Sequence, residues 1–299
     1  MLIKEFVEYL TARGCSGNTV SAYRTDLQQF EMFLRDHRVR CTAVQPRHIQ
    51  EFSQYLIEAR GGHPLAPATI WRKLASVSSY YEFIRYRSNG KINNPVPGVP
   101  RPRRRRSQPN AIDEAAIQQV LAGISNVRDR AMVCVFLASG LRLAELHGLN
   151  RDSISVERKP MPDGSIRVLG VGSVIGKGNK QRLFLVDLGA LDVLTQYLRT
   201  RHDACPALFI SNRGQRISRR EIQHIFSMAC EHVGLPRHHV HQLRHAYAER
   251  LANAGIPAIV LKDLMGHASF NTTQGYFRIK RQRLTSEYFA AMELVPHAG

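Results

Sequence analysis

Apolar positions in the first third of the chain recur at helical spacing. One stripe begins after Ser16 and Asn18, either of which can cap a helix, and two more occupy residues 49–57 and 70–84, with Pro46 near the start of the second stripe. We interpret the stripes as the core of a small bundle of four or five helices. Their apolar members are Tyr23, Leu27, Phe30, Leu34, Ile49, Phe52, Leu56, Ile57, Ile70, Leu74, Val77, Tyr81 and Ile84.

The pattern changes in the second part of the chain. A helix start at Asn110–Glu114 precedes a helix whose apolar positions include Ala131, Val133, Val135 and Phe136. Residues 154–186 are rich in Val and Ile and contain the turn dipeptides Asp163-Gly164 and Gly178-Asn179, which predicts two or three strands. Helical spacing then returns. The expected fold class is mainly α with one small antiparallel sheet (α+β).

Prolines and arginines separate the two patterns. The prolines between positions 95 and 102 remove backbone donors, so no helix is expected to run through this stretch. We therefore predict a helical domain at 1–94, a linker at 95–109 and a second domain at 110–299. A basic run in the linker is either a solvated charge run or a nucleic-acid contact, and such runs favour the second interpretation. It consists of Arg101, Arg103, Arg104, Arg105 and Arg106.

Net charge narrows the class of partner. The 299 residues carry a net charge of +18, of which +10 lies in residues 1–106 and +8 in the remainder. Such a balance favours a polyanion, most simply nucleic acid, over a merely basic protein. Because both parts are basic, we expect both to touch DNA as a two-part clamp. Candidate contacts on the exposed faces of the first domain are Arg24, Arg72 and Lys73.

Cysteine usage and hydropathy favour a cytoplasmic protein without a membrane partner. The five cysteines form no CxxC pair, so we expect reduced thiols rather than disulfides or a zinc site. Lys4, Glu5 and Glu8 interrupt any apolar segment at the N-terminus. No apolar run approaches the roughly 20 residues that cross a bilayer.

A set of polar residues in the last third has the composition of an anion site. His241, Arg244 and His245 stand at i, i+3 and i+4, so on a helix they share one face and can meet one anion. Alone, this spacing would indicate a solvated helix face or a core histidine. The interpretation changes because His267 and Tyr276 follow.

Local signals place Tyr276 on an element separate from the arginines. Gly266 suits the left-handed residue that ends a helix, and His267 would then begin a segment whose backbone N–H groups favour an anion. Asn271-Thr272-Thr273 is expected to cap a further helix that carries Tyr276. The tyrosine can therefore approach a bound phosphate or be withheld from it.

Two upstream motifs complete the set. Arg142 has Glu145 one helical turn further on, which is either a supporting hydrogen-bond partner or an ordinary surface pair. Lys177 stands before a glycine-rich turn, where an ammonium can reach into a DNA groove and donate a proton. Lys180 and Arg182 are neighbours with the same capacity and are further candidate DNA contacts.

Together these motifs resemble the tyrosine recombinases, or phage-type integrases, and especially their Xer-like branch. The resemblance spans nearly the whole chain. It includes the run Asn18–Leu27, which is similar to the core-binding domain, and the hairpin Gly176–Arg182. It implies a helical SAM-like core-binding domain followed by a catalytic tyrosine-recombinase domain. The hairpin before Lys177 departs from the pattern by extra residues, 158–164.

The resemblance also implies roles for the site residues. Tyr276 attacks the scissile phosphate to form a 3′-phosphotyrosine, while Arg142 and Arg244 hold the non-bridging oxygens. Lys177 protonates the leaving oxygen, His241 assists proton transfer at the tyrosine, and His267 hydrogen-bonds the phosphate. Because the covalent link keeps the phosphodiester energy, no cofactor and no metal is expected. The sequence accordingly has no GxxxxGK[ST] loop and no compact carboxylate cluster.

The partner implied is double-stranded DNA with a specific recombination site, bound by a homotetramer on two DNA sites, and a second recombinase or accessory protein is left open. An apolar stripe near the C-terminus is expected to pack against a neighbouring protomer or its own chain. Its members are Leu284, Tyr288, Phe289, Met292 and Leu294.

Several alternatives remain at this point. The longer hairpin favours a mobile-element enzyme over a housekeeping dimer-resolution enzyme. A type IB topoisomerase-like enzyme would use the same chemistry but reseal the same strand as a monomer. A DNA-binding architectural protein that never cuts would explain the basic helices but not the full residue set.

Overall fold

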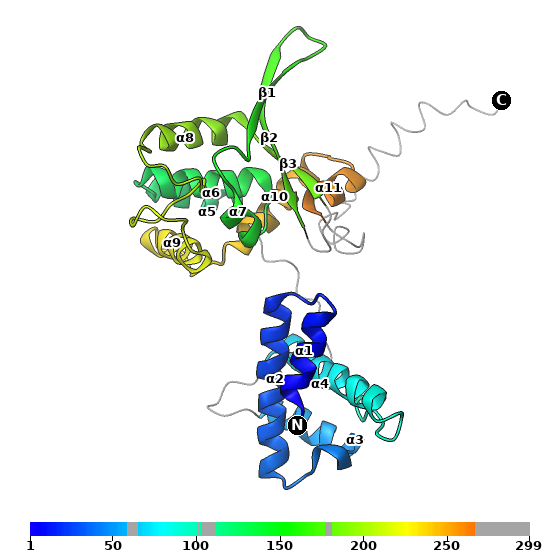
Figure 1. The fold of residues 1–299 in the computed structure, drawn as a ribbon. Coiled ribbons are helices and arrows are strands. Elements are labelled where there is room, and N and C mark those ends of the chain that lie inside the picture. The colour runs from blue at the N-terminus through cyan, green and yellow to red at the C-terminus, as the bar shows by residue number, and fades with distance from the viewer. Residues whose placement is uncertain (59–64, 101, 103–111, 177–180, 267–299) are drawn as a thin grey trace, which may run out of the picture. The chain divides into compact units, whose positions relative to one another are not determined.

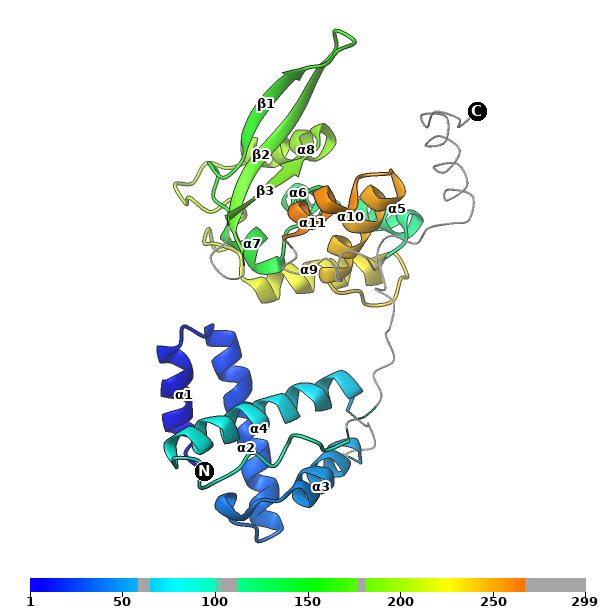
Figure 2. The ribbon, with the colours of Figure 1, turned by 90° about the vertical axis from the view of Figure 1, so that its right-hand side faces the viewer.

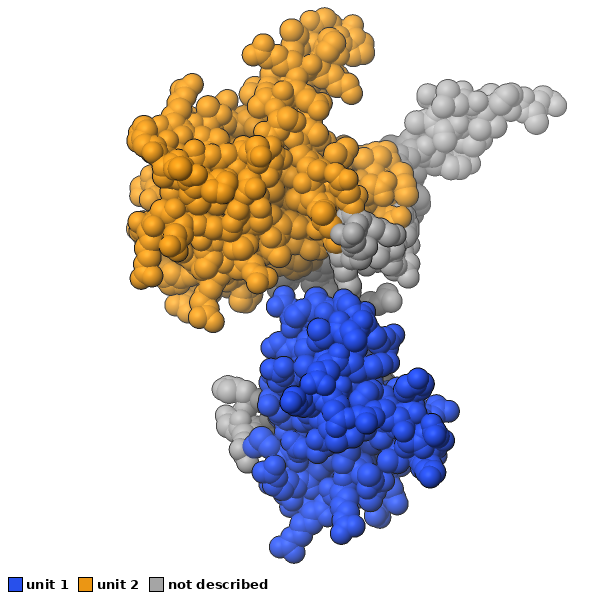
Figure 3. Space-filling model, in the orientation of Figure 1, with its two compact units in different colours: residues 1–106 blue, residues 107–299 orange. Residues whose placement is uncertain are grey.

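The computed structural model describes residues 1–58, 65–100, 102, 112–176 and 181–266. The chain divides into two compact units, residues 1–106 and 107–299, which Figure 3 shows in blue and orange. Several residues predicted from the sequence lie outside the described part: Arg101, Arg103, Arg104, Arg105, Arg106, Lys177, Lys180, His267, Tyr276 and the apolar stripe Leu284–Leu294.

Among its described residues, the regular secondary structure of the first unit consists of helices (Figure 1). Ser16 caps the second helix, where its Oγ accepts the backbone N–H of Thr19 at 3.2 Å, and Pro46 is the first residue of the third. The predicted helical bundle is thereby confirmed. Its elements are α1 (Ile3–Ala12), α2 (Gly17–Asp36), the short 3-10 helix η1 (Cys41–Ala43), α3 (Pro46–Ile57) and α4 (Pro67–Arg87).

The predicted apolar stripes form the core of this unit, with two departures. Tyr23 is only half-buried, and Ile57 is 43% exposed although it was expected inside. Ile57 is the last residue of α3, so no following turn covers it. Every other member of the three stripes is buried.

The expectation that Lys73 lies on an exposed face is wrong. Its side chain is buried, and its Nζ donates to Oδ1 of the buried Asp26 at 3.0 Å. Lys73 stands three residues after Ile70 and four before Val77, so the helical period turns it inward with them. Arg72 pairs with the same carboxylate from a largely exposed position, whereas Arg24 is exposed.

The second unit combines helices with one three-stranded antiparallel sheet, in the order β1-β2-β3. The predicted fold class is therefore confirmed. Its elements are α5 (Glu114–Gly123), α6 (Val127–Ser139), α7 (Leu143–Gly148), β1 (Ser155–Pro160), β2 (Ile166–Ile175), β3 (Gln181–Val186), α8 (Leu188–Arg199), α9 (Arg219–His232), α10 (His241–Asn253) and α11 (Ala258–Met265).

Helix α6 lies at the centre of this unit and packs against α8, α10 and β3. Its Ala131, Val135 and Phe136 are almost completely buried, together with Phe184 and Val186 from alternate positions of β3. The N-cap residues Asp113 and Asn126 begin α5 and α6 by accepting backbone N–H groups. The core thus fixes the starts of α7 and α10, which carry the candidate site.

The β1–β2 hairpin extends beyond the body of the unit (Figures 1 and 2). All of β1 is exposed, and Gly164 makes the turn with a φ of +78°. The predicted extra residues 158–164 form the outer end of this hairpin. Within the described ranges, no helix has both the length and the apolar character needed to span a membrane.

Candidate active site

Arg142 and Glu145 meet at the amino end of α7. Arg142 is the N-cap residue, and its backbone N–H donates to Oε2 of Glu145 at 2.8 Å while its Nη1 donates to Oε1 at 2.8 Å. A carboxylate in the first turn of a helix also interacts favourably with the helix dipole. The carboxylate of Glu145, three positions further along the chain, therefore fixes both the backbone and the guanidinium of Arg142.

Arg244 lies buried on α10, with 2% of its surface exposed. Its Nη1 donates to the carbonyl of Gly140, which ends α6, and its Nη2 donates to the carbonyl of Met265, which ends α11. The carboxyl ends of helices carry partial negative charge, so two of them together stabilise a buried cation. Helix packing thus holds the guanidinium in one place.

Three consecutive carbonyls at the end of α11 each accept from a different arginine. Leu264 accepts from Arg182, Met265 from Arg244, and Gly266 from Arg142 at 2.9 Å. These carbonyls have no partner within the helix, which explains why they are available. Gly266 has a φ of +59°, which confirms the predicted left-handed helix end. His267 follows it directly in the sequence.

Arg182, which the sequence suggested as a candidate DNA contact, is buried. It is 9% exposed, and its Nη2 donates to Oε2 of Glu145 at 2.6 Å. Arg182, Phe184 and Val186 occupy every second position of β3, so all three side chains point to the same buried face. That alternation was visible in the sequence and would have placed Arg182 correctly.

Glu145 is the carboxylate shared by two of the three arginines. Burial alone would raise its pKa, but the backbone N–H of Arg142 and the guanidinium of Arg182 outweigh that effect, so the pKa lies below its usual value. Glu145 is thus ionised at neutral pH. The Arg142 side chain is 34% exposed, compared with 7% for that of Arg182, so Arg142 is the more accessible to a ligand.

His241 and His245 stand one turn apart on α10, and their ring centroids are 4.6 Å apart. Burial lowers the pKa of His241, and the nearby Arg244 and Arg142 lower it further. Burial, His241 and Arg244 lower the pKa of His245 to about 4. Both imidazoles are therefore neutral at neutral pH and can accept a proton or a hydrogen bond.

The described residues accordingly bring together Arg142, Glu145, His241, Arg244 and His245, the part of the predicted set that they contain. They also add Arg182 and the backbone carbonyls at the ends of α6 and α11, which the sequence interpretation missed. Across the described ranges, no cluster of three or more His, Cys, Asp or Glu side chains is placed to hold a metal ion. The arrangement favours an anion close to the arginines.

Comparison with known proteins agrees with this arrangement. The phage integrase family matches residues 110–283, and the N-terminal SAM-like domain of phage integrases matches residues 3–88. The chain belongs to the phage integrase family of tyrosine recombinases. It is 32% identical over 295 residues to tyrosine recombinase XerC of Herpetosiphon aurantiacus, covering 94% of this chain and 91% of that protein.

Solved recombinase structures share the fold. The XerH site-specific recombinase in a post-cleavage complex with its difH substrate superposes with a TM-score of 0.74 at 18% identity, over 96% of this chain and 83% of that one. The Tn1549 transposon integrase in complex with transposon right end DNA gives a TM-score of 0.72 at 18% identity, over 97% and 99% of the two chains.

Membership of the tyrosine recombinases makes this chain an enzyme that breaks and rejoins DNA strands. The similarity to XerC places it in the Xer-like branch, as the sequence motifs indicated. The helical SAM-like first domain and the catalytic second domain follow the same family pattern.

Proposed function

We propose that this tyrosine recombinase cuts and rejoins DNA at a specific site through a 3′-phosphotyrosine formed by Tyr276. The observation that carries the proposal is the position of Arg142 and Arg244. They come from α7 and α10, yet they donate to the carbonyls of the adjacent residues Gly266 and Met265. Both guanidinium groups lie near His241 and contact the residues that directly precede His267 in the sequence. Two cations held in this way can bind one phosphate.

The arginines stabilise the transition state. As the phenolic oxygen of Tyr276 attacks phosphorus, negative charge grows on the non-bridging oxygens, to which Arg142 and Arg244 donate. Because helix ends and Glu145 hold both groups in advance, little reorganisation is needed at the moment of reaction. Loss of one such donor costs about 3–4 kcal/mol of transition-state stabilisation in comparable sites.

Two proton transfers accompany the step. The phenol proton of Tyr276 passes toward His241, whose lowered pKa keeps the imidazole neutral and able to accept it. The bond from phosphorus to the 5′ oxygen breaks, and Lys177 gives that oxygen its proton. His267 hydrogen-bonds the phosphate. The roles of Tyr276, Lys177 and His267 rest on the sequence motifs.

A 5′-hydroxyl from a partner duplex then attacks the phosphotyrosine and exchanges strands. The partner is double-stranded DNA with a recombination site, which the net charge of +18 supports. The XerH and Tn1549 proteins were both solved bound to DNA, which supports the same partner for this chain. We propose a homotetramer on two DNA sites.

Two biological settings each have one supporting observation. The relative named XerC matches nearly the whole chain, which favours housekeeping dimer resolution. The extended β1–β2 hairpin and the similarity in fold to a transposon integrase favour a mobile element. Recombination assays distinguish the two settings. One substrate carries the chromosomal site used for dimer resolution, and the other carries the ends of a mobile element found next to the gene.

Trapping of the covalent adduct tests the proposed chemistry. The full chain is incubated with a nicked oligonucleotide that carries its recombination site, and the adduct is separated on a denaturing gel and mapped by peptide sequencing. We expect the bond at Tyr276. The Tyr276→Phe variant should form no adduct while binding the site with nearly unchanged affinity. A bond at another residue would refute the proposal.

A second assay separates recombination from simple relaxation. Supercoiled DNA with two recombination sites should yield recombinant products. Relaxed DNA without any recombinant product would favour a topoisomerase-like enzyme.

A further inference from the structure

Arg182 is an arginine on the buried face of a strand. Its neighbours on that face, Phe184 and Val186, belong to the apolar core. A charged group in such a place is costly unless it is paired and hydrogen-bonded. The contacts that Arg182 makes therefore indicate why a cation stands there.

The guanidinium of Arg182 joins three elements. It comes from β3, donates to Oε2 of Glu145 on α7 at 2.6 Å, and donates to the carbonyl of Leu264 on α11. Its Nε is buried and has no hydrogen-bond partner among the described residues. Arg182 is thus attached to α7 and α11 by its two terminal nitrogens, as a fork.

Each attachment continues to a proposed catalytic group. Glu145 uses its other oxygen to hold Nη1 of Arg142 at 2.8 Å. The two residues after Leu264 accept from Arg244 and Arg142. A shift of Arg182 would therefore move the carboxylate that orients Arg142 and the helix end that contacts both arginines.

We propose that Arg182 is a positioning residue, which couples β3 to Arg142 through Glu145 and to the carboxyl end of α11. This inference rests on the proposed function. It gives Arg182 a role inside the protein in place of the DNA contact expected from the sequence. Only a planar fork can make both attachments, so lysine, with one ammonium, cannot replace it.

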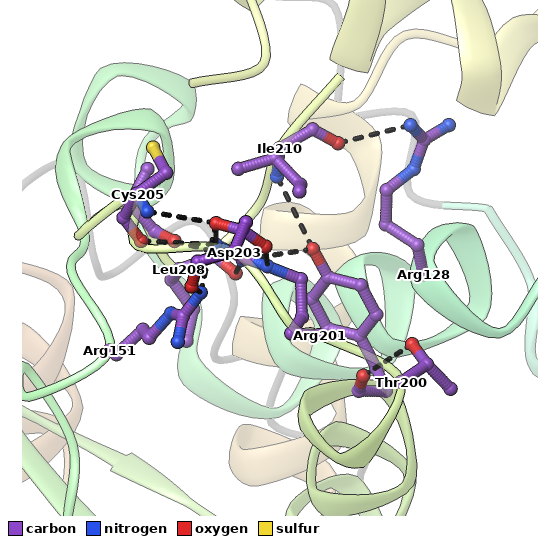
Figure 4. A network of polar contacts seen from close by, with 10 residues as sticks. Arg128, Arg151, Thr200, Arg201, Asp203, Cys205, Leu208 and Ile210 are labelled. Atoms are coloured by element: carbon purple, nitrogen blue, oxygen red, sulfur yellow. Dashed lines mark hydrogen bonds and ion pairs between the residues drawn. The ribbon is translucent and has the colours of Figure 1, made fainter. Parts of the chain in front are cut away.

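Arg201 supplies a matched control in the same unit. Its side chain is 3% exposed and is also held as a fork, by Asp203 and by the carbonyls of Ala207 and Leu208 at 3.1 and 3.0 Å (Figure 4). The groups to which Arg201 donates belong to Tyr197, Asp203, Cys205, Ala207 and Leu208, all outside the candidate site. Loss of Arg201 therefore reproduces the structural cost of losing a buried arginine without disturbing Arg142.

The test compares the full-length variants Arg182→Gln, Arg182→Lys and Arg201→Gln with the wild-type chain. Three quantities are measured at a temperature where the variants are folded: unfolding by urea, affinity for the DNA site, and the rate of adduct formation. Arg182→Gln and Arg201→Gln should both unfold at lower urea. Only Arg182→Gln should lose cleavage rate, by about 100-fold, as expected when a catalytic group is misplaced by about 1 Å.

Arg182→Lys keeps the charge and one attachment. We expect it to recover most of the stability but not the cleavage rate, which a merely structural role would restore. If Arg182→Gln does not fold, this variant decides the question. A rate within about twofold of the wild type in either folded variant would overturn the inference.

Arg182 could instead position Lys177, which precedes it in the sequence. A modified substrate distinguishes that role from the positioning of Arg142. When the bridging 5′ oxygen is replaced by sulfur, the leaving group needs no proton. We expect Arg182→Gln to remain slow on this substrate, because the defect lies at Arg142. Recovery of the rate would assign Arg182 to the lysine and overturn the inference.

The wild-type result distinguishes the role of Arg182 from the proposed function. If the wild type forms the adduct normally and Arg182→Gln forms it at the same rate, only the role of Arg182 is overturned. A wild-type chain that forms no adduct at Tyr276 overturns the proposed function, and this inference with it.

Discussion

The guanidinium of Arg182 donates to the carboxylate of Glu145 at 2.6 Å, although 37 positions separate the two residues along the chain. The same carboxylate holds Arg142. Glu145 is therefore the only acidic group among the described residues that ion-pairs with both arginines.

Glu145→Ala should destabilise the second unit by about 3–5 kcal/mol, because the buried Arg182 loses the carboxylate that offsets its charge. Urea unfolding measures the change. Glu231→Ala is the control, since Glu231 pairs with Arg237 on the surface, where solvent screens the pair and its loss should change stability little. Equal losses in the two variants would contradict the bridging role of Glu145.

Gly266→Ala should lower the cleavage rate, because a methyl group there would stand 2.5 Å from Cδ of Arg182. Gly164→Ala is the control. Gly164 also has a positive φ, but a methyl group there would meet no neighbouring atom. Its alanine variant therefore carries only the cost of a left-handed backbone, about 1–2 kcal/mol. Adduct formation should fall only in Gly266→Ala, and a similar fall in both would show backbone strain to be the cause.

The cleavage rate should fall at acidic pH, with its half-maximal value below pH 6.5. The folded-state pKa of His241 lies below its ordinary value of 6.5, so the neutral form that accepts the proton persists to lower pH and is lost as pH falls through that pKa. Rates on the nicked oligonucleotide measure the profile. A half-maximal rate at or above pH 6.5 would argue against His241 as the acceptor, and His241→Gln should remove this acid limb.

Lys73 and Arg24 should differ in how they affect DNA binding. Arg24 is exposed, so Arg24→Ala should weaken binding and reduce the slope of log affinity against log salt by about one. Lys73 is buried against Asp26, so Lys73→Ala should lower stability and leave the slope unchanged. Binding titrations at several salt concentrations, with urea unfolding alongside, measure both effects. A reduced slope for Lys73→Ala would restore it as a phosphate contact.

Much of the fold was predictable because burial follows the local period of the chain. The stripe from Ile70 to Ile84 identified α4, the helix start predicted within residues 110–114 agrees with α5, and Gly266 identified the end of α11. The two wrong placements arose because charge was considered without the helical or strand periodicity of the position. Lys73 and Arg182 were taken as surface cations, yet each stands in register with buried apolar neighbours.

The sequence by itself determined the residue types of the site and, for its described members, the elements that carry them, because capping, periodicity and motif spacing are local properties. Only the tertiary structure decided that Arg142, Arg182 and Arg244 reach three successive carbonyls at the end of α11. Backbone carbonyls are the same at every position and leave no mark in the sequence. Which of them remain unpaired, and which cation reaches them, depends on how α6, α7, α10 and β3 pack around that helix end.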